Sequence, residues 1–438
     1  NLKGAPENII KKAPFPKSVS LNPSDFHSIT PKMLVKVGDK VKRGDAVFFS
    51  KNNPEIKFCS PVSGKILDIA RGAKRRILEI VINCDAKQQA VKHKISDFSN
   101  FSGDEIKENM LKSGCWPFLK QRPYDIIANP NDVPKAIFVS ALNTAPISAD
   151  LEIILNEQKE EFKTGISLLK KLTKGDLNIC LEKHHNSFIN SIEGVKVHHI
   201  NDLHPAGNVG VQIHHIDPVN SGERVWVVGA EDVALIGKFF MTGEYNPTRT
   251  IAVSGPPVKY PQYYKTIAGS SLSEIIQDAG IDTSEDLRYI NGDVLTGRSV
   301  EKDNYLGFYN NTFSVLREGN QYRMFGWIPF VNNSVPSKYK TSFSWLFPKK
   351  KYDLDTNLNG EERAFVVTGE MEDVFPMDIF PMQLLKECMS GNIEKMENLG
   401  IYEVAPEDFA LIDYSSSSKI EAQKIIREGL DLMISEVG

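Results

Sequence analysis

Apolar and polar residues alternate over several short stretches near the start of the chain, which predicts half-buried β-strands. The apolar positions of the two clearest stretches are Val35, Val37, Leu78, Ile80 and Ile82. Two glycine–aspartate pairs between them are typical of turns, since glycine adopts positive φ without a Cβ clash. The pattern predicts a compact antiparallel, barrel-like module over residues 1–100.

Farther along, short apolar runs of strand length alternate with stripes of helical period. The runs lie at residues 136–142, 176–182, 194–200, 224–229 and 248–255. One helical stripe extends from Leu151 to Leu169, and another occupies residues 230–244. This alternation predicts a mostly parallel sheet with helices, a Rossmann-like α/β domain over residues 101–255.

The pattern changes again near residue 256. Ser271 and Glu274 have the spacing of a capping box at the start of a short helix, and a strand that follows is broken at Asn291-Gly292. A short helix against strands favours a β-grasp-like domain over residues 256–330. Residues 331–365 are irregular, and apolar stripes of helical period predict a helical end to the segment 331–438.

Composition narrows the function classes. The 438 residues carry a net charge of −4 with 25% charged residues, which does not favour nucleic-acid binding. Five scattered cysteines suit a reducing compartment rather than a disulfide framework. The sequence shows neither a secretory signal nor an apolar run of the roughly 18–20 residues that span a bilayer. These features predict a soluble protein on the cytosolic side.

Metal and nucleotide sites are not expected. The three histidine pairs, at 184–185, 198–199 and 214–215, consist of adjacent residues, which point to opposite faces of a strand. Neither H-E-x-x-H nor C-x-x-C occurs. After the run at 136–142 the chain continues Asn143-Thr144-Ala145-Pro146, without the glycine-rich turn that holds a pyrophosphate.

Two loops are nevertheless candidates for binding a small ligand. One follows the strand at 136–142, and the carboxyl ends of such strands are where open α/β sheets bind ligands. The other is His204-Pro-Ala-Gly-Asn-Val-Gly210. The side chains that an aromatic or hydrogen-bonded ligand would use are Phe138, Ser140, Asn143, Thr144 and His204, with Gly207 in the second loop. The alternative is that both loops are ordinary turns.

The stretch VKVGDKVKRGDAVFFSKNNPEIKFCSPVSGKI, residues 35–66, resembles the barrel of biotinyl and lipoyl carrier domains. Those carriers display a modified lysine at a hairpin tip, where chemistry can reach it. The matching tip here reads Asn52-Asn53-Pro54-Glu55, and the nearby Lys51 and Lys57 lack the carrier context. We therefore predict a barrel without a carrier lysine.

Motifs from end to end resemble a larger family, the A subunits of the sodium-translocating NADH:quinone oxidoreductase. Besides the barrel stretch they are RGAKRRILEIVI, SGCWPFLKQRP, AIFVSALNTAP, HPAGNVG, FFMTGE, SVLREG and FGW. The resemblance implies the barrel, an α/β domain, a soluble-ligand-binding β-grasp (SLBB) domain and a C-terminal helical region. That family is distantly similar to the flavin-bearing subunit of respiratory complex I and to the C subunit of the Rnf complex.

The chain departs from those distant relatives in its redox groups. It has neither the glycine-rich flavin loop of the first nor the ferredoxin-type cysteine runs of the second, and serines fill 415–418 where some members of the A-subunit family have cysteines. The resemblance thus implies that this chain binds no redox cofactor of its own. Flavins and iron–sulfur centres would belong to other subunits, and quinone would be the substrate of the complex.

What the resemblance implies for function is a peripheral subunit of a six-subunit complex, on the cytoplasmic side of the bacterial inner membrane, contacting an integral membrane subunit. Such a subunit would support sodium-coupled electron transfer from NADH to quinone, and the two candidate loops become candidates for binding quinone. The alternatives are a redox-inactive structural adaptor and, less favoured because the glycine loop is missing, a free-standing flavin diaphorase.

A docking surface is expected in SFSWLFPKKKY, residues 342–352. Its aromatic side chains Phe343, Trp345 and Phe347 stand beside Lys349, Lys350 and Lys351. Aromatic residues anchor interfaces, and clustered lysines suit an anionic leaflet. The alternative is that these aromatic side chains pack inward on the chain's own helices.

Overall fold

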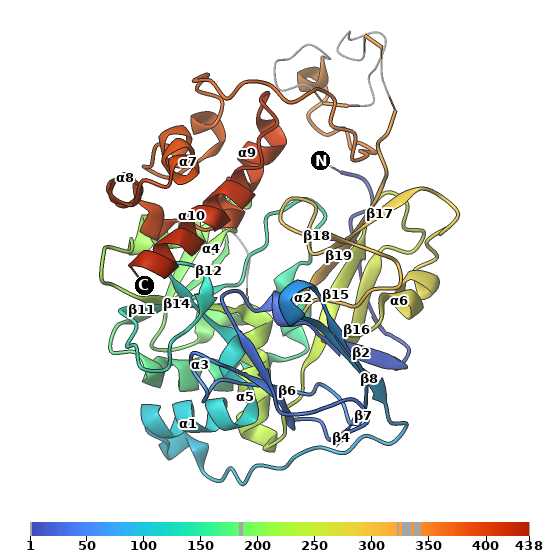
Figure 1. Cartoon of the computed structure of the whole chain (residues 1–438), viewed down its shortest axis with the longest axis vertical. Helices are drawn as coiled ribbons and strands as arrows, with labels where there is room; N and C mark the ends of the chain where they lie inside the picture. The colour runs from blue at the N-terminus through green and yellow to red at the C-terminus, as the bar shows by residue number, and fades with distance from the viewer. Residues whose placement is uncertain (1, 184–186, 322–323, 326–334, 337–342, 438) are drawn as a thin grey trace.

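Four modules of secondary structure follow one another along the chain in a computed structural model that describes residues 2–183, 187–321, 324–325, 335–336 and 343–437 (Figure 1). Of the expectations above, those on His184, His185, Ser342 and Trp327 lie outside the described residues. The order predicted from the sequence, with a barrel, an α/β domain, an SLBB domain and C-terminal helices, is confirmed.

The barrel is a sandwich of two antiparallel sheets. One sheet has the order β2-β8-β7-β4 and the other β3-β5-β6. The strands are β2 (Ser18–Leu21), β3 (Pro31–Met33), β4 (Lys40–Val41), β5 (Ala46–Ser50), β6 (Lys57–Cys59), β7 (Gly64–Arg71) and β8 (Ile77–Cys84). The tip predicted at 52–55 joins β5 to β6, as expected for the hairpin that bears the lysine in carrier domains.

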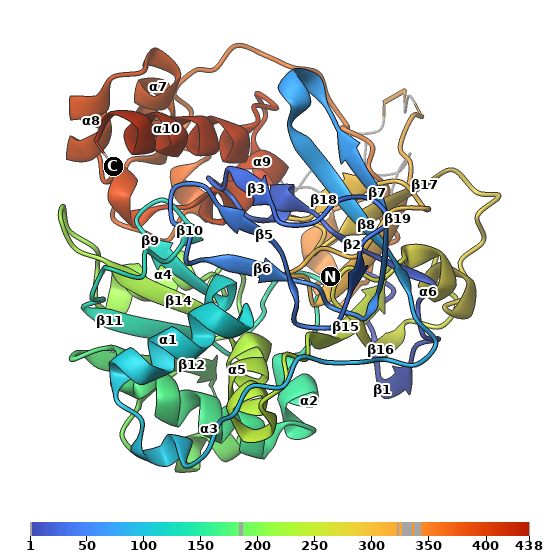
Figure 2. The ribbon, with the colours of Figure 1, turned by 60° about the horizontal axis from the view of Figure 1, so that its bottom comes forward.

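The strands β7 and β8 form a long hairpin that projects from the barrel (Figure 2). Two β-bulges interrupt its register, and the extra residues are Leu67 in β7 and Leu78 in β8. The alternation predicted for Leu78, Ile80 and Ile82 therefore fails at its first member: Ile80 and Ile82 are fully buried, whereas Leu78 is 46% exposed. A bulge turns the following side chain out of the alternating pattern.

The α/β domain has a six-stranded sheet of order β10-β9-β14-β11-β12-β13. The strands β14 (Val225–Gly229), β11 (Ala136–Ser140), β12 (Asp176–Glu182) and β13 (Lys196–Ile200) are parallel, and β9 (Leu119–Arg122) and β10 (Ile126–Ile127) are antiparallel. Counted in chain order among the parallel strands, the spatial order is 3-2-1-4, that of a Rossmann fold. In such sheets ligands bind where the order reverses, here between β11 and β14.

The helices of this domain are α1 (Gly103–Ser113), α2 (Leu151–Asn156), α3 (Lys159–Leu169), α4 (Val209–Ile216) and α5 (Ala230–Thr242). The predicted single stripe from Leu151 to Leu169 is therefore two helices, α2 and α3, which are broken at residues 157–158. The α4 helix begins directly after the loop that starts at His204, and α5 begins where β14 ends.

A second six-stranded sheet, of order β1-β16-β15-β19-β17-β18, forms the SLBB domain. Its elements are β1 (Glu7–Lys12), β15 (Thr248–Ser254), β16 (Gln262–Ile267), α6 (Leu272–Asp278), β17 (Leu287–Asn291), β18 (Arg298–Val300) and β19 (Thr312–Arg317). The strand predicted at 248–255 belongs to this sheet rather than to the α/β sheet. The first strand of the chain, β1, also joins it, in parallel with β16.

The α6 helix begins at Ser271, whose hydroxyl accepts the N–H of Ser273, so the predicted N-cap is confirmed. The reciprocal half of the capping box is not formed: the Glu274 Oε2 atom is buried without a hydrogen-bond partner among the described residues.

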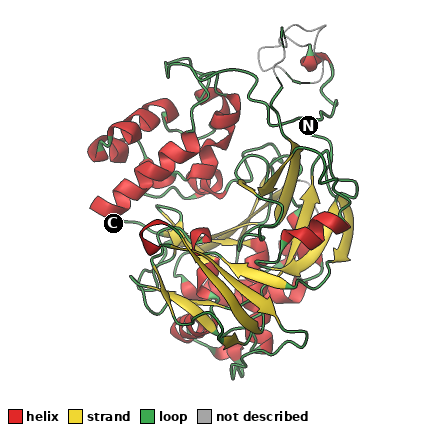
Figure 3. Ribbon diagram, turned by 45° about the vertical axis from the view of Figure 1, so that its right-hand side comes forward, coloured by secondary structure: helices red, strands yellow, loops and turns green. Residues whose placement is uncertain are grey.

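The C-terminal helices α7 (Pro381–Ser390), α8 (Ile393–Asn398), α9 (Ala410–Ser415) and α10 (Ala422–Glu436) gather into a bundle beside the sheets (Figure 3). Their apolar side chains form one cluster that also contains Tyr124 and Val211 of the α/β domain. The bundle is therefore packed on that domain by a shared core. Of the serines at 415–418, the first ends α9 and the other three lie between α9 and α10.

Aromatic side chains join the first three modules. Phe26 of the barrel lies 4.8 Å from Phe308 of the SLBB domain, and Phe308 stacks on Phe118 of the α/β domain at 5.3 Å between ring centroids. The buried guanidinium of Arg249 lies against both Phe118 and Phe308. These contacts fix the SLBB domain over the carboxyl edge of the α/β sheet.

Candidate functional site

A cavity of about 270 Å³ lies at the reversal point of the α/β sheet. Its floor is made by the carboxyl ends of β11 and β14, at Ser140 and Gly229. The SLBB domain contributes Asp293 and Tyr309, and the C-terminal module contributes Glu407. The fold thus places three modules around the position where doubly wound sheets bind ligands.

Five of the six residues predicted for a ligand site line this cavity: Ser140, Asn143, Thr144, His204 and Gly207. The sixth, Phe138, does not. Its side chain is fully buried under α4, in a cluster with Val209 and Ile213: it shares a face of β11 with Ser140 but lies two residues farther from the carboxyl end of the strand. In this structure its ring belongs to the core and offers no face to a ligand.

The two predicted loops are hydrogen-bonded to each other. The Thr144 hydroxyl accepts the N–H of Gly207 at 2.9 Å and lies 3.1 Å from His204 Nδ1. Asn143 donates its side-chain amide to the carbonyl of Ala149 at 3.0 Å, so part of its polar capacity is used within its own loop.

His204 lines the cavity, and the role of its Nε2 atom depends on which ring nitrogen carries the proton. If the hydroxyl proton of Thr144 is donated to Nδ1, the imidazole carries its own proton on Nε2. The Nε2 atom is buried and has no hydrogen-bond partner among the described residues. Burial lowers the pKa of His204, which favours this neutral form. A ligand oxygen in the cavity would satisfy this donor.

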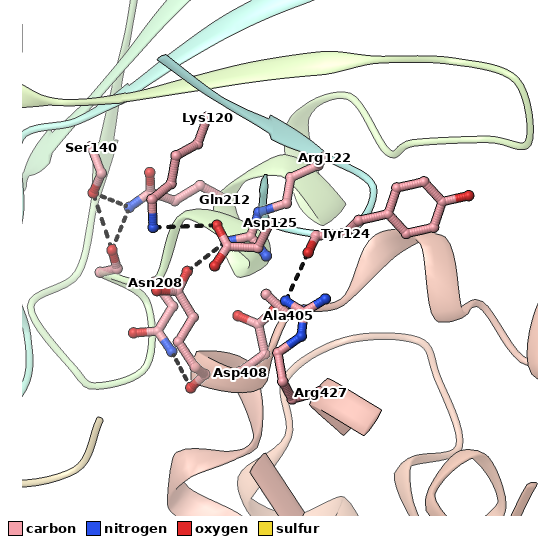
Figure 4. A network of polar contacts seen from close by, with 12 residues as sticks. Lys120, Arg122, Tyr124, Asp125, Ser140, Asn208, Gln212, Ala405, Asp408 and Arg427 are labelled. Carbon is pink, nitrogen blue, oxygen red and sulfur yellow. Dashed lines mark hydrogen bonds and ion pairs between the residues drawn. The ribbon is translucent and has the colours of Figure 1, made fainter. Parts of the chain in front are cut away.

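The wall opposite is charged and joins the α/β domain to the C-terminal module (Figure 4). Arg122, whose side chain is 2% exposed, donates to Glu407 at 2.8 Å and lies 3.8 Å from Asp125. Arg427 of α10 donates to the carbonyl of Tyr124. Burial alone would raise the pKa of Asp125, but the positive charges of Lys120 and Arg122 outweigh it and hold that pKa well below its usual range.

Asp408, which does not itself line the cavity, is the third carboxyl group near Arg122 and the least compensated. Its Oδ2 accepts the N–H of Ala405 at 2.9 Å, while its Oδ1 is buried without a partner among the described residues. Burial, together with the negative charge of Glu407, raises the pKa of Asp408 to about 7. The nearest cation, Arg122, is already shared by Glu407 and Asp125.

Carboxylates of the chain itself cover the two helix N-termini that face the cavity, where a phosphate would otherwise bind. At α5, Asp232 lies over Gly229 and pairs with the buried Arg249 at 2.5 Å. At α4, a Cβ added to Gly210 would come within 2.3 Å of the Asp408 carboxylate. The positive ends of both helices are therefore occupied by negative side chains.

The histidines of the pairs at 198–199 and 214–215 have structural partners in different parts of the fold. His214 pairs with Glu403 at 2.7 Å and His215 lies 2.8 Å from the carbonyl of Pro376, so both tie α4 to the C-terminal module. His198 lies 2.9 Å from the side chain of Asn178 in the neighbouring strand. Within the described part of the chain, no three histidine, cysteine or acidic side chains gather as they would around a metal ion.

Comparison with known proteins covers most of the chain. Residues 1–85 match the family described as the NqrA N-terminal barrel-sandwich hybrid domain, residues 101–245 the NqrA second alpha/beta domain, and residues 250–302 the NQRA C-terminal domain, its SLBB domain. The A subunit of the Na(+)-translocating NADH-quinone reductase of Marinomonas sp. is 36% identical over 99% of this chain and 97% of its own length. The chain belongs to this NqrA family.

Other members of the NqrA family are similarly related. The proteins of Neisseria meningitidis and Vibrio campbellii are each 34% identical, over 99% of this chain and 97% of their own lengths. Among solved structures, an NAD+-reducing [NiFe]-hydrogenase matches with a TM-score of 0.39 and 11% identity, over 77% of this chain and 62% of its own, a likeness too weak to carry an argument.

The charged wall is the part of the cavity that the sequence did not predict. Lys120 and Arg122 lie in SGCWPFLKQRP, a stretch that carried the resemblance to the NqrA family but offered no sign of their position. Glu407 and Asp408 lie in a C-terminal segment whose stripes indicated only helices. The one available sign of this wall was the Arg122-Pro123 pair at the end of a strand.

The predicted docking segment lies on the surface. Its aromatic side chains are exposed, Trp345 by 54% and Phe347 by 62%. Lys350 lies over the ring of Tyr352 at 5.1 Å. The alternative in which these aromatic side chains pack inward does not describe this structure. In the described part of the chain, no helix is long and apolar enough to cross a membrane.

Proposed function

We propose that the chain is the peripheral, cytoplasmic-side subunit of a sodium-translocating NADH:quinone reductase complex, and that its cavity binds the headgroup of a quinone. The main support is similarity at 36% identity over 99% of the chain to a protein that carries that name. The isolated chain would have no reductase activity, since the flavins and iron–sulfur centre of the proposed complex belong to other subunits. The alternative function is a redox-inactive adaptor that docks on the membrane subunits.

Three features of the cavity support a quinone. Its size is near the lower end of the roughly 300–1,000 Å³ range of ligand pockets, which suits a single ring better than a dinucleotide. The buried donor on His204 matches a quinone carbonyl, which only accepts hydrogen bonds. The carboxylates at the N-termini of α4 and α5 disfavour a phosphate-bearing cofactor. Ser140, Asn143, Thr144 and Gly207 complete the proposed site.

The test is titration of the purified chain with a soluble quinone. The His204→Ala substitution removes a net hydrogen bond of about 0.5–1.5 kcal/mol. It should therefore weaken quinone binding roughly 3- to 10-fold. Asn143→Ala should weaken it less, because the Asn143 amide is engaged by Ala149. The exposed His199→Ala is the matched control. Wild-type chain that does not bind quinone, or binds it equally after His204→Ala, would favour the adaptor.

For docking, we propose that Phe343, Trp345 and Phe347, with Lys349, Lys350 and Lys351, contact an integral membrane subunit. Exposed aromatic side chains beside cations support an interface anchor. The double variant Trp345→Ser/Phe347→Ser should remain folded but leave the membrane fraction of cells that express the complex. A folded variant that stays fully bound to the membrane would exclude this segment as the dock.

A further inference from the structure

The outer end of the β7–β8 hairpin carries a concentrated positive charge. Beyond the Ile69–Ile80 pair these strands pair only with each other, because the pairing with β4 ends at Lys65 and the pairing with β2 ends at Ile80. We call residues 70–79 the basic ribbon. Its side chains Arg71, Lys74, Arg75 and Arg76 are exposed, and no carboxylate lies within ion-pair distance of any of them in the described part of the chain. The chain as a whole is negative, with a net charge of −4.

The turn of the ribbon has residues that its backbone does not favour. Lys74 and Arg75 both adopt the left-handed conformation, with φ of 53° and 61°. Hairpin turns with two such residues strongly prefer Asn-Gly, since most side chains clash there. Turn formation therefore does not explain a lysine and an arginine at these two positions. What accounts for them is their positive charge, since the turn is the outer end of the projecting hairpin (Figure 2).

Exposed leucines accompany the cations. Leu67 and Leu78 are the extra residues of the two β-bulges, and they are 59% and 46% exposed. Bulges commonly re-aim a side chain, and here each turns a leucine away from the barrel core. The Leu78 side chain lies over Gly72, directly beside the basic turn.

We propose that the basic ribbon binds the surface of an anionic phospholipid bilayer. Cations at a protruding tip reach lipid phosphates, while Leu78 beside them reaches the boundary of the acyl chains. An acidic protein would match the cations alone. The proposal rests on the proposed position at the membrane, and it adds a second contact that is independent of residues 343–351 and of the quinone site.

The experiment is sedimentation of the full chain with phosphatidylcholine vesicles, with and without phosphatidylglycerol. Lys74→Asn/Arg75→Gly removes two charges and installs the preferred turn pair. At about 1 kcal/mol per charge, binding to the anionic vesicles should weaken about 30-fold. The thermal midpoint should stay equal or rise, because the turn is relieved. Leu78→Ser should weaken binding with the charge unchanged.

The matched control is Lys36→Ala/Lys40→Ala, which removes two exposed charges from the same barrel outside the ribbon and should change binding far less. Equal losses in the two double variants would overturn the proposal in favour of diffuse attraction. The proposal is also overturned if the wild-type chain does not bind anionic vesicles. Ribbon-dependent binding to polyglutamate without binding to vesicles would assign the ribbon to an acidic protein. None of these outcomes affects the quinone titration or the Trp345→Ser/Phe347→Ser variant.

Discussion

Asp408 makes the stability of the chain depend on pH, and Asp408→Asn should remove that dependence. The pKa of the folded carboxyl group, about 7, lies above its ordinary value of 3.8. Between these values the folded chain binds a proton that the unfolded chain has released. The free energy of unfolding therefore falls as pH rises from about 4 to about 7, and it stays low above that range. Asparagine cannot ionise and retains an acceptor for the N–H of Ala405.

The magnitude follows from the shift. About three pKa units at 1.36 kcal/mol each give a ceiling of about 4 kcal/mol, and we expect Asp408→Asn to gain about 2–4 kcal/mol over the wild type above neutral pH. At about pH 4, near the ordinary pKa of the carboxyl group, the two proteins should have nearly equal stability, because little of the difference has yet developed. The physical cause is that Asp408 is fully buried while Arg122 is committed to Glu407 and Asp125.

Urea unfolding at about pH 4 and about pH 8.5 measures the effect, because these two pH values bracket the titration. Trp116 and Trp226, stacked edge to face in the α/β core at 5.4 Å, provide a fluorescence signal for the domain on which Asp408 packs. Glu407→Gln is the control: it removes the closest partner of Arg122 and should destabilise the chain at both pH values. An advantage of Asp408→Asn that is equal at both pH values, or larger in acid, would refute the reasoning.

Three further predictions follow from packing. Gly210→Ala should destabilise the junction of α4 with the C-terminal module by about 1–3 kcal/mol in urea unfolding, since the new Cβ meets Asp408, whereas Gly360→Ala should be nearly neutral. Phe138→Ala should cost about 3–5 kcal/mol of stability, as a core residue does, and a stable variant with weakened quinone binding would return Phe138 to the site. All five cysteine thiols, whose pKa burial raises to about 12, should react slowly with Ellman's reagent until the chain is denatured; fast native reaction of any one would contradict this.

Local patterns predicted the elements but not where they meet. The run at 136–142 and the loop after it placed Ser140, Asn143 and Thr144 at the carboxyl end of a strand, and the structure brings His204 to the same cavity because the two loops flank the reversal point of the sheet. Arg122 and Glu407 lie in different modules, and their contact depends on how the C-terminal bundle packs. No periodicity encodes such a contact.

The errors also have local physical causes. Period-two alternation placed Leu78 inside, but it cannot detect a bulge, which inserts one residue and reverses the facing of the next. Apolar residues at helical spacing continue across the break between α2 and α3, since both helices pack on the same core. Phe138 was assigned to the ligand site because a strand buried on both faces has no pattern that separates side chains at its carboxyl end from those in the core beneath a helix.

The pairing of β1 with β16 has a consequence for how the chain is made. Glu7 aligns with Gln262, so β1 can pair with β16 only after some 250 further residues have been translated. At about 5–20 residues per second, that interval lasts roughly 12–50 seconds on the ribosome. During it, β1 is a strand of the nascent chain that lacks its β16 partner. The sequence of β1, ENIIKK, ends in two lysines, and lysines on a strand edge discourage pairing with other chains. We therefore expect the charges of Lys11 and Lys12 to disfavour pairing of β1 with other chains until the SLBB domain of the nascent protein has been synthesised.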